Sequence, residues 1–158
     1  LLYSATGTPG VNSHLASTHT QNGGRYLFSH LPAGQYLVHV AADNFKPYSF
    51  NGGTNYVAGP LHGLLSVPGT TTGDDDLGED GIGVTNPEQI GITSAPVTLT
   101  VGGAPVFTGT ETGAYLDMNA VHGDANVDLT IDFGFREPTA GAPLAQRTTN
   151  TLTLPGTT

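Results

Sequence analysis

The most regular pattern of apolar and polar residues lies in residues 125–135 (ANVDLTIDFGF). Every second residue is apolar, and the side chains that share this face are Val127, Leu129, Ile131, Phe133 and Phe135. The other face carries Asp128, Thr130 and Asp132. Because side chains alternate between the two faces of a strand, we predict a half-buried β-strand whose two carboxylates face solvent.

Residues 24–45 predict two further strands, joined around residues 31–34 (LPAG). The side chains expected to face the core are Tyr26 and Phe28 on the first strand and Tyr36, Val38 and Val40 on the second. Proline fixes φ in the connection, and Gly34 is free to adopt a positive φ. His39 falls on the face opposite Val38 and Val40, so we expect it to be exposed to solvent.

Residues 94–103 predict another strand, and its inward side chains are Val97, Leu99 and Val101. Weaker patterns indicate strands at 1–6 and 14–20, and either a short strand or an irregular crossing at 113–121. We expect almost no helix, since no window of 11 or more residues follows a period of about 3.6. Short strands at this spacing predict an all-β fold, an Ig-like β-sandwich.

The long middle of the chain, residues 43–93, is rich in glycine and has no regular apolar period. Its second half contains residues 73–83 (GDDDLGEDGIG), whose carboxylates are Asp74, Asp75, Asp76, Glu79 and Asp80. Like charges within about 8–10 Å repel one another. Two interpretations remain open: a solvated acidic loop, or a calcium site that wraps about six to eight oxygen ligands around the ion. The segment is no EF-hand, because Pro87 stands twelfth from Asp76 where that loop has glutamate.

Composition narrows the classes of function. The chain has 158 residues, of which 13 are acidic and 4 are basic, and its formal net charge is −9. Such a surface repels nucleic acid and anionic lipid, so neither is expected as a partner. There is no cysteine, which excludes a disulfide framework and a thiolate metal site. No apolar run approaches the roughly 20 residues of a membrane-spanning helix, so no membrane insertion is expected.

Three stretches in order, GRYLFSHLPAGQYLVHV (24–40), TSAPVTLTVGG (93–103) and NVDLTIDFGF (126–135), resemble the B-like domain of serine-aspartate repeat surface adhesins. That family belongs with the collagen-adhesin B-type, prealbumin-like β-sandwiches. The resemblance covers residues 1–136 and implies a secreted, non-catalytic sandwich, often repeated in surface stalks and often bound to calcium. It implies an extracellular or cell-surface location. Residues 137–158 then form a linker and a terminal strand.

The chain departs from this family in two places. The sequence begins inside what corresponds to the second strand, so an opening strand is missing and an exposed sheet edge is expected. Related pilin-type domains form Lys–Asn isopeptide bonds. The only lysine, Lys46, follows a strand rather than opening one, so we predict no such bond.

Other polar residues give weaker signals. The six histidines lack the spacing of a metal motif, and zinc would require distant members to meet: His14, His19, His30, His39, His62 and His122. Several acids and amides are expected in turns or caps rather than as ligands: Asp43, Asn44, Asp117, Asn119, Asp124 and Asn126. Ser29 and His30 are neighbours on a predicted strand and point to opposite faces, so they form no nucleophile–base pair. No nucleophile elbow, P-loop or dinucleotide motif is present, and we predict no enzymatic activity.

Two classes of function remain: a structural module of a surface adhesin or fibre, and a module that binds a carbohydrate or a host protein. Three aromatic residues, Tyr48, Phe50 and Tyr56, either form a sugar platform or fill the sandwich edge. The tail ends in an alternating stretch, Thr151, Leu152, Thr153 and Leu154. This stretch predicts a strand that pairs with the open edge of a neighbouring copy or repeat, and such head-to-tail contacts build a filament. The simpler alternative is that it begins the next repeat.

Overall fold

A computed structural model describes residues 1–21, 24–49, 56–67, 80–103, 128 and 131–138. Within these residues the strands are β1 (Leu2–Ser4), β2 (Gly34–Val40), β3 (Tyr48–Ser49), β4 (Tyr56–Val57), β5 (Leu65–Val67), β6 (Gly81–Ile82), β7 (Ile92–Ser94), β8 (Val97–Leu99) and β9 (Gly134–Arg136). Helical structure there is limited to α1 (Pro87–Ile90) and the 3-10 turn η1 (Ala42–Asn44). The paired strands are antiparallel, and the predicted all-β fold is confirmed.

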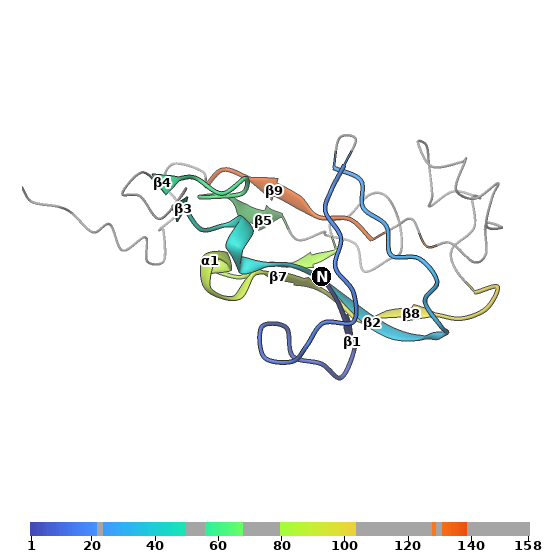
Figure 1. Ribbon diagram of the computed structural model, residues 1–158. Helices are drawn as coiled ribbons and strands as arrows, with labels where there is room; N and C mark the ends of the chain where they lie inside the picture. Colours follow the sequence, from blue (N-terminus) through green and yellow to red (C-terminus); the bar gives the residue numbers. More distant parts are fainter. Residues whose placement is uncertain (22–23, 50–55, 68–79, 104–127, 129–130, 139–158) are drawn as a thin grey trace, which may run out of the picture.

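Strand β2 is the centre of the main sheet (Figure 1). It pairs with β1 along one side, where Leu2 lies opposite Val38. Along its other side it pairs first with β8 and then with β7, and β6 continues the sheet beyond β7. Neighbours on both sides satisfy the backbone groups of β2. Its two faces are covered separately, since buried side chains occur on both of them: Tyr36 and Val38 on one face and His39 on the other.

A side chain fills the gap between β7 and β8. The two strands are separated by Ala95 and Pro96, and proline has no N–H to donate to a sheet. The Oγ of Ser94 accepts a hydrogen bond from the Val38 amide at 3.0 Å and donates one to the Ala95 carbonyl at 2.8 Å. Ser94 is buried, so this hydroxyl satisfies an amide that the ladder leaves without a backbone partner.

The core forms on one face of this sheet around Leu2, Tyr36 and Val38. Partly buried side chains that pack against it are Ala16, Tyr26, Phe28, Leu31, Leu99, Ile131 and Phe133. The predicted inward faces are therefore correct for seven of these residues: Tyr26, Phe28, Tyr36, Val38, Leu99, Ile131 and Phe133. The strand predicted before residue 31 is wrong, because the described residues there form one isolated bridge, Gln21 to Arg25. Gly34 does not use its freedom to adopt a positive φ, and the residue with a positive φ in this connection is His30 (φ 60°).

The N-terminal strand is confirmed as β1, whereas residues 14–20 contribute only a bridge between Leu2 and Ala16. Two hydrogen bonds cover the outer edge of β1: the Leu2 amide donates to the Ala16 carbonyl at 2.9 Å, and the Leu15 amide donates to the Leu2 carbonyl at 2.7 Å. The expectation of an exposed edge is therefore wrong at Leu2.

The strand predicted at 94–103 is shorter than expected. Val97 and Leu99 are half-buried on β8, but Val101 is 90% exposed, so its inward assignment is wrong. The chain turns just after β8, where Gly102 has a φ of 68° and the Gly103 amide donates to the Thr100 carbonyl at 3.0 Å. Because of this turn Val101 lies outside the sheet, although the alternation of apolar and polar residues in the sequence continues through it.

The described parts of residues 43–93 are not structureless. They include the hairpin pair β3–β4, strand β5 paired with β9, and β6, α1 and β7. These strands are two or three residues long, too short for a period to be visible in the sequence.

Residues 131–136, which include β9, are called the closing segment. Within the described residues this segment is a strand only over β9. Phe135 packs edge-to-face on Phe45, with ring centroids 5.6 Å apart. The hydroxyl of Tyr26 donates to the Ile131 carbonyl, which ties residues 131–133 to the core without a ladder. Asp132 is partly buried, so the prediction that its carboxylate faces solvent is wrong. Val127, Leu129 and Thr130, like the segment 113–121, lie outside the described residues.

Candidate functional site

One acid of the predicted calcium segment, Asp80, lies among the described residues, and it is bonded to the closing segment. The Asp80 amide donates to the Asp132 carbonyl at 3.0 Å, and the Asp132 amide donates to Oδ2 of Asp80 at 2.9 Å. These two hydrogen bonds join residues that are 52 positions apart in the chain. Asp74, Asp75, Asp76 and Glu79 lie outside the described residues.

The local sequence explains why Asp80 lies there. It precedes β6, where Gly81 is packed so tightly that a Cβ would lie 2.9 Å from both Ile92 Cγ2 and Phe133 Cδ1. The buried Ser66 donates its hydroxyl to the Gly81 carbonyl at 3.3 Å. Only glycine allows β6 to approach this closely, and the approach carries Asp80 to residue 132.

The chemistry of Asp80 is compatible with a cation. A carboxylate offers about four lone-pair positions, so it can accept an N–H and also serve as a metal ligand. The part of the chain that the structure describes contains no group of three or more His, Asp or Glu side chains that could hold a metal ion. The calcium site remains a prediction that depends on the acids at 74–79.

A second feature is a pocket of about 450 Å³ at the C-terminal end of β2. Its lining residues are Leu1, Tyr3, Pro9, Gly10, Val11, His39, Ala41, Ala42, Asp43, Lys46, Gln89 and Ile90. They come from β1, the following turn, β2, η1 and α1. The sequence offered no sign of this pocket, because it assembles from residues far apart in the chain.

His39 lies in the wall of this pocket and is only 4% exposed, so the prediction that it faces solvent is wrong. The reason is that β2 is a central strand with both faces covered. The Tyr3 ring packs edge-to-face on the imidazole at 5.8 Å, and Nδ1 of His39 lies 2.8 Å from the Thr93 hydroxyl. Burial lowers the pKa of His39 to about 4, so the imidazole is neutral at neutral pH.

Two charged residues lie at the same pocket. Nζ of Lys46 is 3.0 Å from Oδ1 of Asp43, and both side chains are substantially exposed. Asn44 donates from its side chain to the Ala41 carbonyl at 3.0 Å. Asp43 and Asn44 therefore shape the turn after β2, as predicted, and both belong to η1.

Ser29 and His30 are closer than the sequence predicted. Nδ1 of His30 lies 3.0 Å from the Ser29 hydroxyl, because the positive φ of His30 breaks the strand alternation. The expectation that the two side chains point to opposite faces is wrong. Both side chains are exposed, and a solvated contact of this kind does not desolvate or activate a nucleophile.

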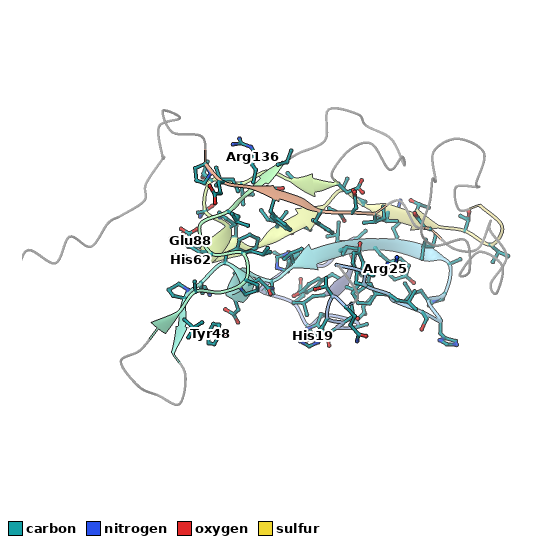
Figure 2. The ribbon with its side chains drawn as sticks, turned by 90° about the horizontal axis from the view of Figure 1, so that it is seen from above. His19, Arg25, Tyr48, His62, Glu88 and Arg136 are labelled. Carbon is teal, nitrogen blue, oxygen red and sulfur yellow. The ribbon has the colours of Figure 1, made fainter. Side chains whose placement is uncertain are left out.

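The remaining histidines and aromatics are dispersed. His14 packs edge-to-face on Tyr3 at 6.2 Å, and His19 and His62 are exposed. Tyr48 is 49% exposed on the β3–β4 hairpin (Figure 2). His122, Phe50, the side chain of Tyr56, and the acids and amides at 117, 119, 124 and 126 lie outside the described residues, as do residues 151–154.

No known protein family, no curated protein and no solved structure matches this chain. Among the described residues, none of the helices has the length and apolar character needed to cross a membrane. The functional conclusion therefore depends on the geometry of the chain itself.

Proposed function

We propose that the chain is a non-catalytic structural module of a bacterial cell-surface adhesin or extracellular fibre, stabilised by calcium. The observation that carries this proposal is the reciprocal link between Asp80 and Asp132. The final acid of the acidic segment is bonded to the segment that leads into β9. A cation that orders the acids at 74–80 would therefore also hold the closing segment in place.

The packing supports a sandwich of the prealbumin-like kind. Ile131 and Phe133 pack against the cluster on the main sheet, and Phe135 packs on Phe45. The β5–β9 pair lies above β2 and β7 in Figure 1. A closing segment that covers one face of the main sheet is what a two-layer architecture requires. The proposed domain spans residues 1–136, with 137–158 as its tail.

The proposed partners are neighbouring copies or repeats of the same protein, which the tail strand at 151–154 would reach. The low number of basic residues supports an acidic, calcium-dependent surface rather than one that binds nucleic acid. The proposed location is extracellular or at the cell surface.

The test replaces acids by amides in the full chain: Asp74→Asn, Asp76→Asn and Asp80→Asn. Chelation should lower the thermal midpoint of the unmodified chain by roughly 5–10 °C if calcium is bound well above its dissociation constant. Each variant should reduce that response, because each removes a ligand charge and keeps the side-chain shape. The amide introduced by Asp80→Asn retains an oxygen that accepts the Asp132 N–H, so the effect of this variant reports on the charge.

Glu137→Gln is the matched control, since Glu137 is exposed and lies outside the acidic segment. It should respond to chelation like the unmodified chain. An identical midpoint with calcium and with chelator in the unmodified chain would reject the calcium-stabilised module.

A second candidate function is recognition of a carbohydrate or a host protein. It is favoured by the half-exposed Tyr48, which lies opposite the 46%-exposed Val57 in the β3–β4 pair. Aromatic faces of this kind stack on sugar rings. A glycan array that shows signal for the unmodified chain and none for Tyr48→Ala would support this candidate, whereas an array without hits would leave the structural module.

A further inference from the structure

The pocket beside Tyr3 and His39 has walls of mixed polarity, in which two large apolar side chains are left exposed. Val11 is 79% exposed and Ile90 is 53% exposed, and both line this pocket. They come from segments nearly 80 positions apart, the turn after β1 and the end of α1. Two large apolar side chains exposed at one cavity indicate a docking surface rather than scattered surface residues. The volume lies within the range of about 300–1,000 Å³ that ligand pockets occupy.

The charges of the side chains that line this pocket are balanced. Its lining side chains include one carboxylate, Asp43, and one ammonium group, Lys46, and these two pair with each other. His39 adds no charge, because its imidazole is neutral. In a chain of net charge −9, most of the surface repels a second copy. This face allows another copy to approach without that repulsion.

The tail of the chain is a segment whose side chains suit this pocket. Residues 148–158 (TTNTLTLPGTT) carry no charged side chain. Leu152 and Leu154 are two residues apart, so in an extended chain they share a face and lie about 6.5–7 Å from each other. An uncharged strand with two apolar side chains on one face suits a pocket that exposes Val11 and Ile90 and whose charged side chains pair with each other.

We infer that the pocket lined by Val11, Tyr3 and Ile90 receives Leu152 and Leu154 from a second copy of this chain. The inference rests on the proposed assembly of copies through the tail and identifies the surface that accepts it. The turn after β1 and the end of α1 form the two apolar sides of the acceptor. The segment 137–147, rich in Pro, Ala and Gly, is the linker between the donor domain and this contact.

The experiment is sedimentation velocity of the full chain over a range of concentrations. Four variants are compared with it: Leu152→Asp with Leu154→Asp in the tail, Val11→Asp and Ile90→Asp in the pocket, and Val101→Asp as a control. Val101 is a matched control because it is the same residue type as Val11, is 90% exposed and lies outside the pocket. Thermal midpoints identify any variant that fails to fold, and the two pocket variants substitute for each other in that case.

We expect the unmodified chain and Val101→Asp to associate in the same concentration range. The tail variant and both pocket variants should associate about ten-fold more weakly or worse, as loss of an interface anchor does. Mixing the tail variant with Val11→Asp sharpens the test. Only one junction can form in that mixture, between the intact tail of one and the intact pocket of the other, so discrete dimers should appear although each variant alone is monomeric.

The outcomes separate the inference from the proposal on which it rests. If the tail variant loses association and the pocket variants keep it, the pocket is not the acceptor, while assembly through the tail stands with another acceptor such as β8. An equal loss in Val101→Asp would also overturn the inference, since added charge alone would explain the effect. A full chain that stays monomeric at every concentration overturns both.

Discussion

Strand β2 and the closing segment 131–136 both alternate apolar and polar residues, yet they are built differently. β2 has neighbours on both sides, and buried residues occur on both of its faces: Tyr36 and Val38 on one, His39 on the other. The closing segment is a strand only over β9, and Ile131 and Phe133 remain half-buried. The more regular sequence pattern thus belongs to the less buried segment. Alternation indicates which side chains share a face, but not how many neighbours a strand has.

The largest expected effect comes from replacing a buried isoleucine of the β2 sheet by alanine, and the same replacement in the closing segment measures the difference between the two regions. Ile92→Ala on β7 removes a side chain that is 0% exposed and should lower the free energy of unfolding by about 2–5 kcal/mol. Ile131→Ala should lower it by about half as much or less, since Ile131 is only partly buried. Urea unfolding of the two variants gives both values. Equal losses would show that the closing segment is as well buried as the β2 sheet.

The next largest effect on stability is expected at Gly91, a glycine that lies against β2. Gly91 has a φ of 70°, and a Cβ there would overlap the Val40 carbonyl oxygen and lie 2.5 Å from Cε1 of His39. Gly91→Ala should therefore lower the free energy of unfolding by about 2–4 kcal/mol, from backbone strain and overpacking together.

Gly102→Ala isolates the strain alone. Its φ is 68°, but no atom lies within 4 Å of the added Cβ, so we expect a loss of only about 1–2 kcal/mol. Thermal and urea unfolding compare the two variants. Equal effects at the two glycines would mean that β2 and α1 do not pack as closely as the structure shows.

The buried imidazole of His39 predicts a dependence of stability on pH. Burial lowers its folded-state pKa to about 4, below the ordinary value of about 6.5 in the unfolded chain. The unfolded state then binds more protons between these values, so this contribution is complete above pH 6.5 and is lost as the pH falls toward 4. We expect a loss of about 1–3 kcal/mol over that interval.

His39→Gln should flatten this part of the profile, whereas His62→Gln, at an exposed site, should leave it unchanged. Urea unfolding at several pH values measures both. The three chains contain the same acidic residues, so the difference between their profiles isolates His39. Parallel profiles for the unmodified chain and His39→Gln would contradict a buried imidazole.

The sequence predicted the all-β class, the strands β1 and β2, and the core positions of Tyr36, Val38, Ile131 and Phe133. Local patterns suffice for these features because each depends on residues two positions apart. His39 was misassigned because burial on the second face of β2 depends on β1 and α1, which are distant in the chain. The pocket was missed for the same reason. The link from Asp80 to Asp132 spans 52 positions and involves the backbone groups of both residues as well as the Asp80 carboxylate, a pairing that sequence patterns do not reveal.

The central claim is that the acidic segment holds the closing segment through Asp80, and amide hydrogen exchange of Asp132 tests it most directly. With calcium present, the Asp132 amide should exchange about ten-fold more slowly or slower than with chelator, because ordering of the acids stabilises the bond to Asp80. In Asp76→Asn this difference should shrink. The same exchange rate at Asp132 with calcium and with chelator would contradict the claim.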